Sequence, residues 1–171
     1  RSGRDFHKFA VACIKTRSSA HIMCLEHDAE TMYEKLPSHV SMEVGWQEPH
    51  DVYKKLKNAL AIAIPLLSQK FTSGLTSLCD ALGMGKAVLM PENIGIDLDV
   101  EKLGIGKIVQ TNNVEGWSKT LNWVKEHREQ TIKMGTKARE FALQNYNCDL
   151  FAKSVSDCIK KCIAREPLER I

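Results

Sequence analysis

Apolar positions along the chain follow two periods, one typical of buried strands and one typical of amphipathic helices. Three short runs, AHIMCL, LAIAI and AVLM, are apolar at every position except His21, a pattern that favours parallel strands covered on both faces. Between these runs, apolar residues recur every three or four positions, as in helices that bury one face. The pattern therefore predicts an α/β fold in which helices flank a parallel sheet.

The same periodicity predicts the order of the elements. Helices are expected at residues 5–16, 28–35, 49–58, 73–84, 114–127, 129–145 and 149–164, and strands at 20–25, 40–44, 59–64, 86–90 and 107–109. Because strands and helices alternate, we expect one doubly wound, Rossmann-like sheet within a single domain over residues 1–171. The aromatic side chains of the last helices are expected in the core: Trp117, Trp123, Phe141, Tyr146 and Phe151.

Residues 73–90, SGLTSLCDALGMGKAVLM, combine a small-residue turn, an amphipathic helix and an apolar strand. A helix that begins near Ser73 places Leu75 on an apolar face together with Leu78, Cys79 and Leu82. Free backbone N–H groups at the start of such a helix, together with the positive end of its dipole, attract a phosphate. The segment therefore predicts a phosphate-binding turn, with an ordinary helix cap as the alternative interpretation.

Asp80 lies about two turns beyond Ser73 and Gly74, roughly 10 Å along the helix axis at about 1.5 Å per residue. A carboxylate at that distance can accept hydrogen bonds from ribose hydroxyls while the helix start holds a diphosphate. The spacing is therefore consistent with a nucleotide site, and a solvated aspartate is the alternative.

The second half of this segment, from Asp80 to Val88, resembles the donor-binding element of GT-B glycosyltransferases of the glycogen-synthase-like (group 1) family, which ends in Glu-Ala-Met-Ala-x-Gly-x-Pro-Val. Asp80 takes the place of the family's ribose-binding glutamate. The preceding glutamate of the family falls on Thr72, and the turn instead resembles that of undecaprenyl-linked N-acetylglucosamine transferases. The resemblance implies donor contacts from Thr72, Ser73, Gly74, Leu75 and Asp80.

Two further stretches are similar to the same family. The opening RSGRDFHKFAVAC resembles its diphosphate-binding segment, which implies that Arg1 and Arg4 act as the catalytic contacts to the leaving diphosphate; a guanidinium suits this role because it donates paired hydrogen bonds. Residues 40–65 resemble its strand, glycine turn, helix and proline-ended strand, which implies that Gly45, Trp46 and Gln47 lie beside the base. Solvated arginines and a packing tryptophan are the alternative interpretations.

By this resemblance the chain is the donor domain of a GT-B enzyme, whose first strand and acceptor-binding amino-terminal half lie outside the 171 residues, either in a longer chain or in a separate subunit. The implied activity is hexosyl transfer from a nucleoside-diphosphate sugar, such as a UDP- or GDP-sugar, to an acceptor saccharide or lipid-linked glycan in polysaccharide, lipopolysaccharide or glycoconjugate biosynthesis. It is expected to retain the anomeric configuration, to need no metal, and to be absent from the isolated domain. A GT-B-like nucleotide-sugar epimerase and a non-catalytic nucleotide-sugar-binding module are the alternatives.

Composition narrows the choice of partners. The net charge is +3 and the basic residues are dispersed, which does not favour nucleic acid. Lys54, Lys55 and Lys57 form a basic face that is expected to be solvated, with peripheral contact to a membrane as the alternative. The six cysteines contain no Cys-x-x-Cys pair and are typical of buried free thiols in a reducing cytoplasm. The expected location is therefore cytoplasmic, and an enzyme with a lipid-linked acceptor would lie at the inner face of the membrane. Together with the scattered histidines, the cysteines predict neither a metal site nor an acid–base pair.

Overall fold

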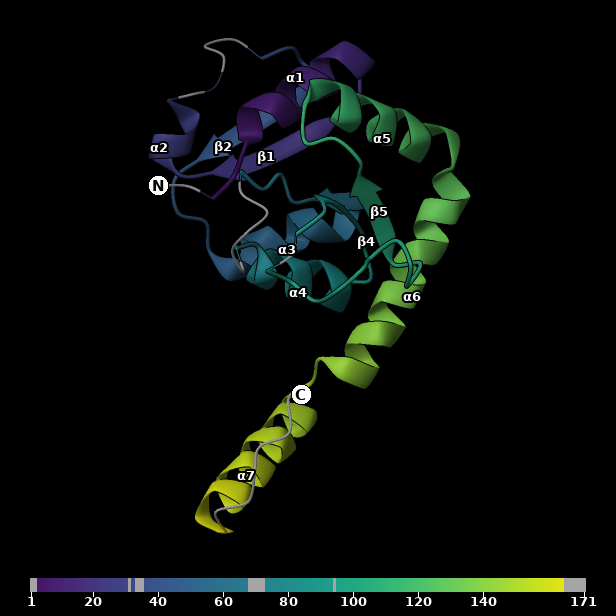
Figure 1. Ribbon diagram of the computed structural model, residues 1–171. Helices are drawn as coiled ribbons and strands as arrows, with labels where there is room; N and C mark the ends of the chain where they lie inside the picture. Colours follow the sequence, from purple (N-terminus) through teal and green to yellow (C-terminus); the bar gives the residue numbers. More distant parts are fainter. Residues whose placement is uncertain (1–2, 31, 33–35, 68–72, 94, 165–171) are drawn as a thin grey trace.

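The computed structural model describes residues 3–30, 32, 36–67, 73–93 and 95–164. Helices and strands alternate from α1 to β4, β5 follows β4 directly, and three helices end this part of the chain (Figure 1). The elements are α1 (Phe6–Thr16), β1 (Ala20–Cys24), α2 (Glu26–Ala29), β2 (Val40–Val44), α3 (Pro49–Asn58), β3 (Ala61–Ala63), α4 (Leu75–Gly83), β4 (Ala87–Pro91), β5 (Gly106–Val109), α5 (Val114–Glu126), α6 (Arg128–Asn145) and α7 (Cys148–Ala164).

The strands form two small parallel sheets. β1 pairs with β2 in a register that runs from Ala20 opposite Val40 to Cys24 opposite Val44. β4 lies between β3 and β5 and is parallel to both. The predicted α/β class with parallel strands and flanking helices is confirmed, but the described strands pair as two sheets where the sequence pattern predicted one.

Helices cover the strands from two sides. α1 and α5 pack together on one hydrophobic core, where the rings of Phe9 and Trp117 meet edge to face with centroids 5.2 Å apart. α4 and α6 contribute to a second core, which contains Val88 and Met90 of β4, whereas Leu89 of the same strand belongs to the first. Because successive side chains of a strand point to opposite faces, the two cores lie on opposite sides of the sheet.

β3 and β4 differ in burial although both are apolar. All five residues of β4 are buried, but each of the three residues of β3 is only half-buried. β4 has a paired neighbour on both edges, and β3 is paired along one edge, with β4. The expectation that every apolar run is fully covered therefore holds for β4 and not for β3.

α4 departs from its predicted start. The helix begins at Leu75, and its N-cap is Gly74 with a φ of +93°, in place of the expected Ser73. Its buried residues are Leu78, Ala81 and Leu82, while Leu75 is 41% exposed. The prediction that Leu75 is buried on the apolar face was wrong, because Leu75 is the first residue of the helix and lies at its exposed end.

The carboxyl-terminal helices are less buried than predicted. Trp117 is fully buried and Trp123 and Phe141 are half-buried, but Tyr146 is 45% exposed and Phe151 is 72% exposed. α7 has no buried residue and lies apart from the sheets (Figure 1). The prediction of a core position was therefore wrong for Tyr146 and Phe151.

The cysteines have free thiols but only partly buried positions. Cys13 and Cys24 are buried, whereas Cys148 and Cys162 are exposed. Burial raises the pKa of the Cys13 thiol to about 12, so this group stays protonated at neutral pH. Among the described residues, no helix has both the length and the apolar character that crossing a membrane requires.

Candidate functional site

Five of the residues singled out in the sequence line one cleft of about 1160 Å³. They come from three separate segments of the chain: Arg4, the turn Gly45, Trp46 and Gln47, and Asp80. The loops that carry Arg4, Gly45 and Gln47 lie near the carboxyl ends of β1, β2 and β3, the edge of a parallel sheet at which α/β proteins bind ligands. The fold therefore brings together residues that are up to 76 positions apart in sequence.

Residues 3–5 reach the start of α4 by lying along the segment that follows β3. The Asp5 N–H donates to the Pro65 carbonyl at 2.7 Å, and the Leu67 N–H donates to the Gly3 carbonyl at 2.9 Å. Arg4 and Leu66 form an isolated antiparallel bridge between these bonds. The backbone of the opening segment is therefore fixed beside the turn that precedes α4.

The Arg4 side chain lies against the first turn of α4. Its Nη2 donates a hydrogen bond of 2.8 Å to Ser77 Oγ. A Cβ on Gly74 would lie 3.0 Å from Arg4 Nη1 and 2.9 Å from Leu66 Cδ2, so the backbone passes close to the guanidinium only because this position is glycine. The positive φ of Gly74 is a second reason, since side chains disfavour that conformation.

Burial lowers the pKa of Arg4, and the neighbouring carboxylate of Asp28 acts in the opposite direction. An arginine keeps its charge in proteins even when its pKa falls. A permanent cation therefore stands at the amino end of α4, where the backbone N–H groups and the helix dipole also favour an anion. Arg4 and the helix start would therefore both favour an anion here, and the Asp28 carboxylate would act against it.

Asp28 is a member of this site that sequence reasoning missed. It belongs to the short helix α2, which follows β1, and it is 9% exposed. Besides acting on Arg4, it lines the same cleft. The available signal was its position three residues after the end of the strand predicted at 20–25, where residues that follow the strands of parallel sheets gather at the ligand-binding edge.

Asp80 lies further along the α4 side of the cleft. Its Oδ1 accepts a hydrogen bond of 3.3 Å from the Tyr53 hydroxyl, which comes from α3. The side chain thus stays at the cleft wall, half-buried, with capacity to accept further hydrogen bonds, because an ionised carboxylate has about four acceptor positions. Tyr53 was not identified from the sequence.

Gly45, Trp46 and Gln47 form the turn after β2. The Gly45 N–H donates to the Cys24 carbonyl at 2.9 Å, and its φ of +101° requires glycine. Trp46 is 78% exposed, so it is not the packing aromatic of the alternative interpretation. Gln47 Oε1 accepts a hydrogen bond of 3.4 Å from Lys55 of α3.

The other residues predicted to contact the donor do not line the cleft or lie outside the described residues. Ser73 is half-buried, and its side chain lies near Gly3, where a Cβ would be 3.3 Å from Ser73 Cβ. Leu75 is the first residue of α4 and points toward solvent. Arg1 and Thr72 lie outside the described residues. The assignment of all these residues to a donor site stays a prediction.

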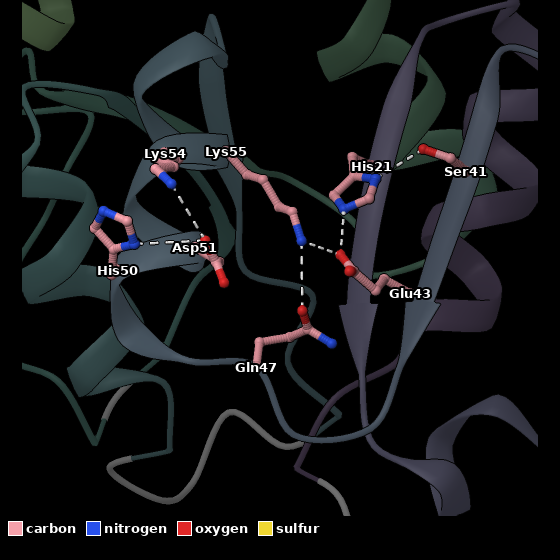
Figure 2. Close-up of polar contacts among 8 residues, drawn as sticks. All are labelled: His21, Ser41, Glu43, Gln47, His50, Asp51, Lys54 and Lys55. Atoms are coloured by element: carbon pink, nitrogen blue, oxygen red, sulfur yellow. Dashed lines mark hydrogen bonds and ion pairs between the residues drawn. The ribbon is translucent and has the colours of Figure 1, made fainter.

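A polar cluster links β1, β2 and α3 beside the cleft (Figure 2). His21 Nδ1 lies 2.8 Å from Ser41 Oγ, and His21 Nε2 lies 3.2 Å from Glu43 Oε2. Glu43 also accepts a hydrogen bond from Lys55. His21, one of the histidines that are scattered in the sequence, therefore has polar partners in the fold, since residues 22 positions apart meet across two paired strands.

This cluster is better explained by packing than by chemistry. The side chains of His21, Glu43 and Lys55 are 38%, 37% and 31% exposed. Lys55 joins Glu43 to Gln47, and His50 and Lys54 contact Asp51 on the outer face of α3 (Figure 2). The contacts fix α3 and the 45–47 turn at the mouth of the cleft. Within the described residues, no group of three or more His, Cys, Asp or Glu side chains is arranged to hold a metal ion.

Comparisons with known proteins do not assign the chain to a family. No protein-family model matches the sequence, and no curated protein matches it significantly. Functional interpretation therefore rests on the geometry of the cleft and on the sequence pattern that singled out its residues.

Proposed function

We propose that this chain binds a nucleoside-diphosphate sugar and forms the donor-binding part of a glycosyltransferase. The observation that carries the proposal is the meeting of Arg4 with the amino end of α4 in the cleft that Asp80 lines. The cation comes from the opening segment, whereas the helix start and the carboxylate both belong to α4, and the three follow the order that a diphosphate and a ribose would need. The parallel strands with helices on both sides support a doubly wound, Rossmann-like donor half of a GT-B enzyme.

In this proposal each part of the donor has its own contact. The diphosphate accepts hydrogen bonds from Arg4 and from the backbone N–H groups of the first turn of α4. The ribose hydroxyls donate to Asp80, and the base lies against Trp46 at the exposed end of the cleft. These contacts span about two helical turns, roughly 10 Å, which a nucleoside diphosphate can bridge.

The catalytic contribution of these residues is electrostatic. When the bond between the sugar and the diphosphate breaks, negative charge grows on the leaving diphosphate, and Arg4 with the α4 amides stabilises that charge without reorganising. The acceptor, a saccharide or lipid-linked glycan, is held by the other half of the enzyme, and the transfer is proposed to be metal-independent and to retain the anomeric configuration. A cytoplasmic enzyme fits this donor and the free thiols.

Calorimetric titration with UDP, GDP, ADP and NAD tests the proposal directly. We expect selective binding of one nucleoside diphosphate and a loss of about tenfold in affinity for Asp80→Asn, the value of one hydrogen bond to a charged group. Arg4→Gln should cost at least as much, because it removes a charge from a half-buried site. Asp51→Asn is the matched control, since Asp51 contacts His50 and Lys54 outside the cleft.

Two results would contradict the proposal. One is the absence of binding of any of these nucleotides to a folded wild-type chain. The other is nucleotide affinity that Asp80→Asn and Asp51→Asn leave equally unchanged. Nucleotide binding without sugar transfer, once the acceptor half is supplied, would identify a nucleotide-sugar-binding module instead of a transferase.

A further inference from the structure

The same cleft continues from the proposed nucleotide site into the space between the two sheets. Every residue of β1 and every residue of β3 lines it, whereas β2 contributes only Ser41 and β4 only Leu89. Its volume of about 1160 Å³ is above the range of about 300–1,000 Å³ that is usual for small-molecule sites. A cleft that runs between two strands along their length has the shape of the space that a further strand would occupy.

The backbone groups that face this space can be identified from the existing ladders. In β1, the Ala20 N–H donates to the His39 carbonyl and the Cys24 carbonyl accepts from the Gly45 N–H. Since both backbone groups of a residue in a parallel ladder point to the same side and successive residues alternate, Ala20, Ile22 and Cys24 bond toward β2. The N–H and C=O groups of His21 and Met23 therefore point into the cleft.

The same alternation applies to β3. The Ile64 N–H donates to the Leu89 carbonyl of β4, so Ile64 and Ile62 bond toward β4. Ala61 and Ala63 then present their N–H and C=O groups to the cleft. Two rows of backbone donors and acceptors thus face each other from β1 and β3, in the spacing of alternate residues that a further strand requires.

β1 and β3 run in the same direction. Asp28, which follows β1, interacts with Arg4. Asp5, the residue after Arg4, donates its backbone N–H to the carbonyl of Pro65, which follows β3. The carboxyl ends of both strands therefore lie at the same mouth of the cleft. A strand parallel to both can form two ladders at once, which an antiparallel or irregular segment cannot do equally well.

Both faces of the cleft carry apolar side chains. Phe9 of α1 and Leu121 of α5 line it on one side. Val52 and Leu56 line it from α3. Met42 of β2 packs against the core that α1 and α5 share, so the next residue, Glu43, points to the opposite face. Because Lys55 of α3 contacts Glu43, α3 lies on that opposite face. A strand in the cleft would place alternate side chains against each surface, so apolar residues are required at successive positions.

We propose that the cleft binds an extended, apolar peptide segment of about five residues, which pairs parallel with both β1 and β3 and joins the two sheets into one. The inference concerns the strand edges and does not depend on the proposed nucleotide function. It also explains why β3 is only half-buried although its composition is that of a central strand. Main-chain pairing gives such a site its affinity and the apolar surfaces give it its side-chain preference.

The test uses a synthetic peptide added to the intact chain. Its centre reads Val-Ile-Val-Ile-Val, with a glutamate before it to meet Arg17, Lys125 and Arg128 at the amino-end mouth and a serine after it. We expect saturable binding and at least about tenfold slower amide exchange at His21, Met23, Ala61 and Ala63, because these N–H groups gain acceptors. The matched control peptide has proline at the central position, which removes one N–H and breaks the ladder, and should bind about tenfold more weakly.

A protein variant sharpens the result. Met23→Pro removes one cleft-facing N–H while the β1 groups that bond to β2 stay, so it should lose peptide binding, and Met23→Leu should keep it. Should Met23→Pro fail to fold, which loss of slow exchange in β4 would reveal, a peptide methylated on its central backbone nitrogen decides the question without any change in the protein. Any of three results overturns the proposal. The proline peptide binds as tightly as the Val-Ile peptide, or the peptide leaves the exchange rates of the four amides unchanged. The third is that these amides become protected without peptide, when the chain dimerises.

Discussion

β3 and β4 are neighbouring apolar strands that differ in burial. β4 is paired on both edges and is buried at all five positions. Among the described strands, β3 is paired with β4 alone, and it is half-buried at all three positions. Helices lie over both strands, so the difference comes from the second edge of β3, which borders the cleft. Burial of an apolar strand therefore depends on its lateral neighbours as much as on the helices that cover it.

The largest expected effect compares truncations in these two strands. Met90→Ala in β4 removes a side chain that is 2% exposed and should lower the free energy of unfolding by about 2–5 kcal/mol. Ile62→Ala in β3 removes a half-buried side chain and should cost less than half of that amount. Urea denaturation measures both. Equal losses would contradict the contrast between the strands, and a cost of Ile62→Ala that grows when the strand peptide is bound would sharpen it.

A second comparison uses the two ends of α4, which leads from β3 to β4. Gly74→Ala places a Cβ at positive φ, 2.9 Å from Leu66 Cδ2, and should lower stability by about 1–2 kcal/mol. It should also weaken nucleotide binding, because the new methyl group displaces Arg4. Gly83→Ala is the control: its Cβ meets no atom within 4 Å, and it should raise stability by about 0.5–1 kcal/mol.

These variants separate the two proposals about the cleft. Thermal unfolding and nucleotide titration give the two readouts for the Gly74 and Gly83 pair. Peptide binding between β1 and β3 should not change in Gly74→Ala, since the substitution lies beyond the carboxyl end of β3. A Gly74→Ala chain that loses peptide and nucleotide together would show that the strand edges and the anion site are one unit.

The smallest effect concerns the cluster that fixes α3 over the open side of the sheets. A hydrogen bond from Lys55, supported by one from His21, holds the pKa of Glu43 below its usual value of 4.5. A carboxyl group with a lowered pKa stabilises the fold above the pKa it has when unfolded, and this contribution is lost as the pH falls through the folded value. Stability should therefore fall below about pH 4.5, and Glu43→Gln should flatten that part of the profile. An unchanged pH profile would show that the exposed cluster contributes nothing, as many surface ion pairs do.

Local pattern was sufficient for most element boundaries. The apolar run at residues 87–90 predicted β4, and the three- and four-residue period predicted α3, because short-range sequence determines these periods. The candidate residues Gly45, Gly74 and Asp80 were also found from local motifs. In each of these segments, the residues that determine the local structure lie within a few positions of one another in the sequence.

The misses come from contacts between distant segments. Nothing local to Arg4 indicates Ser77 as its partner, and nothing local to Asp28 indicates that it will face a cation. His21 meets Glu43 only because β1 and β2 pair in one particular register. The apolar face of α7, with Phe151 at 72% exposure, shows the converse, since an amphipathic pattern predicts a helix but does not specify what covers it.

The exposed indole of Trp46 gives the chain an optical signal of its own. The sequence has three tryptophans, of which Trp117 is fully buried and Trp123 is stacked on His127 with ring centroids 4.6 Å apart. Trp46, at 78% exposure, should therefore dominate the red side of the emission spectrum and the fraction that acrylamide quenches. A ligand at the mouth of the cleft would shield that fraction alone, so occupancy can be followed by fluorescence in the unlabelled protein.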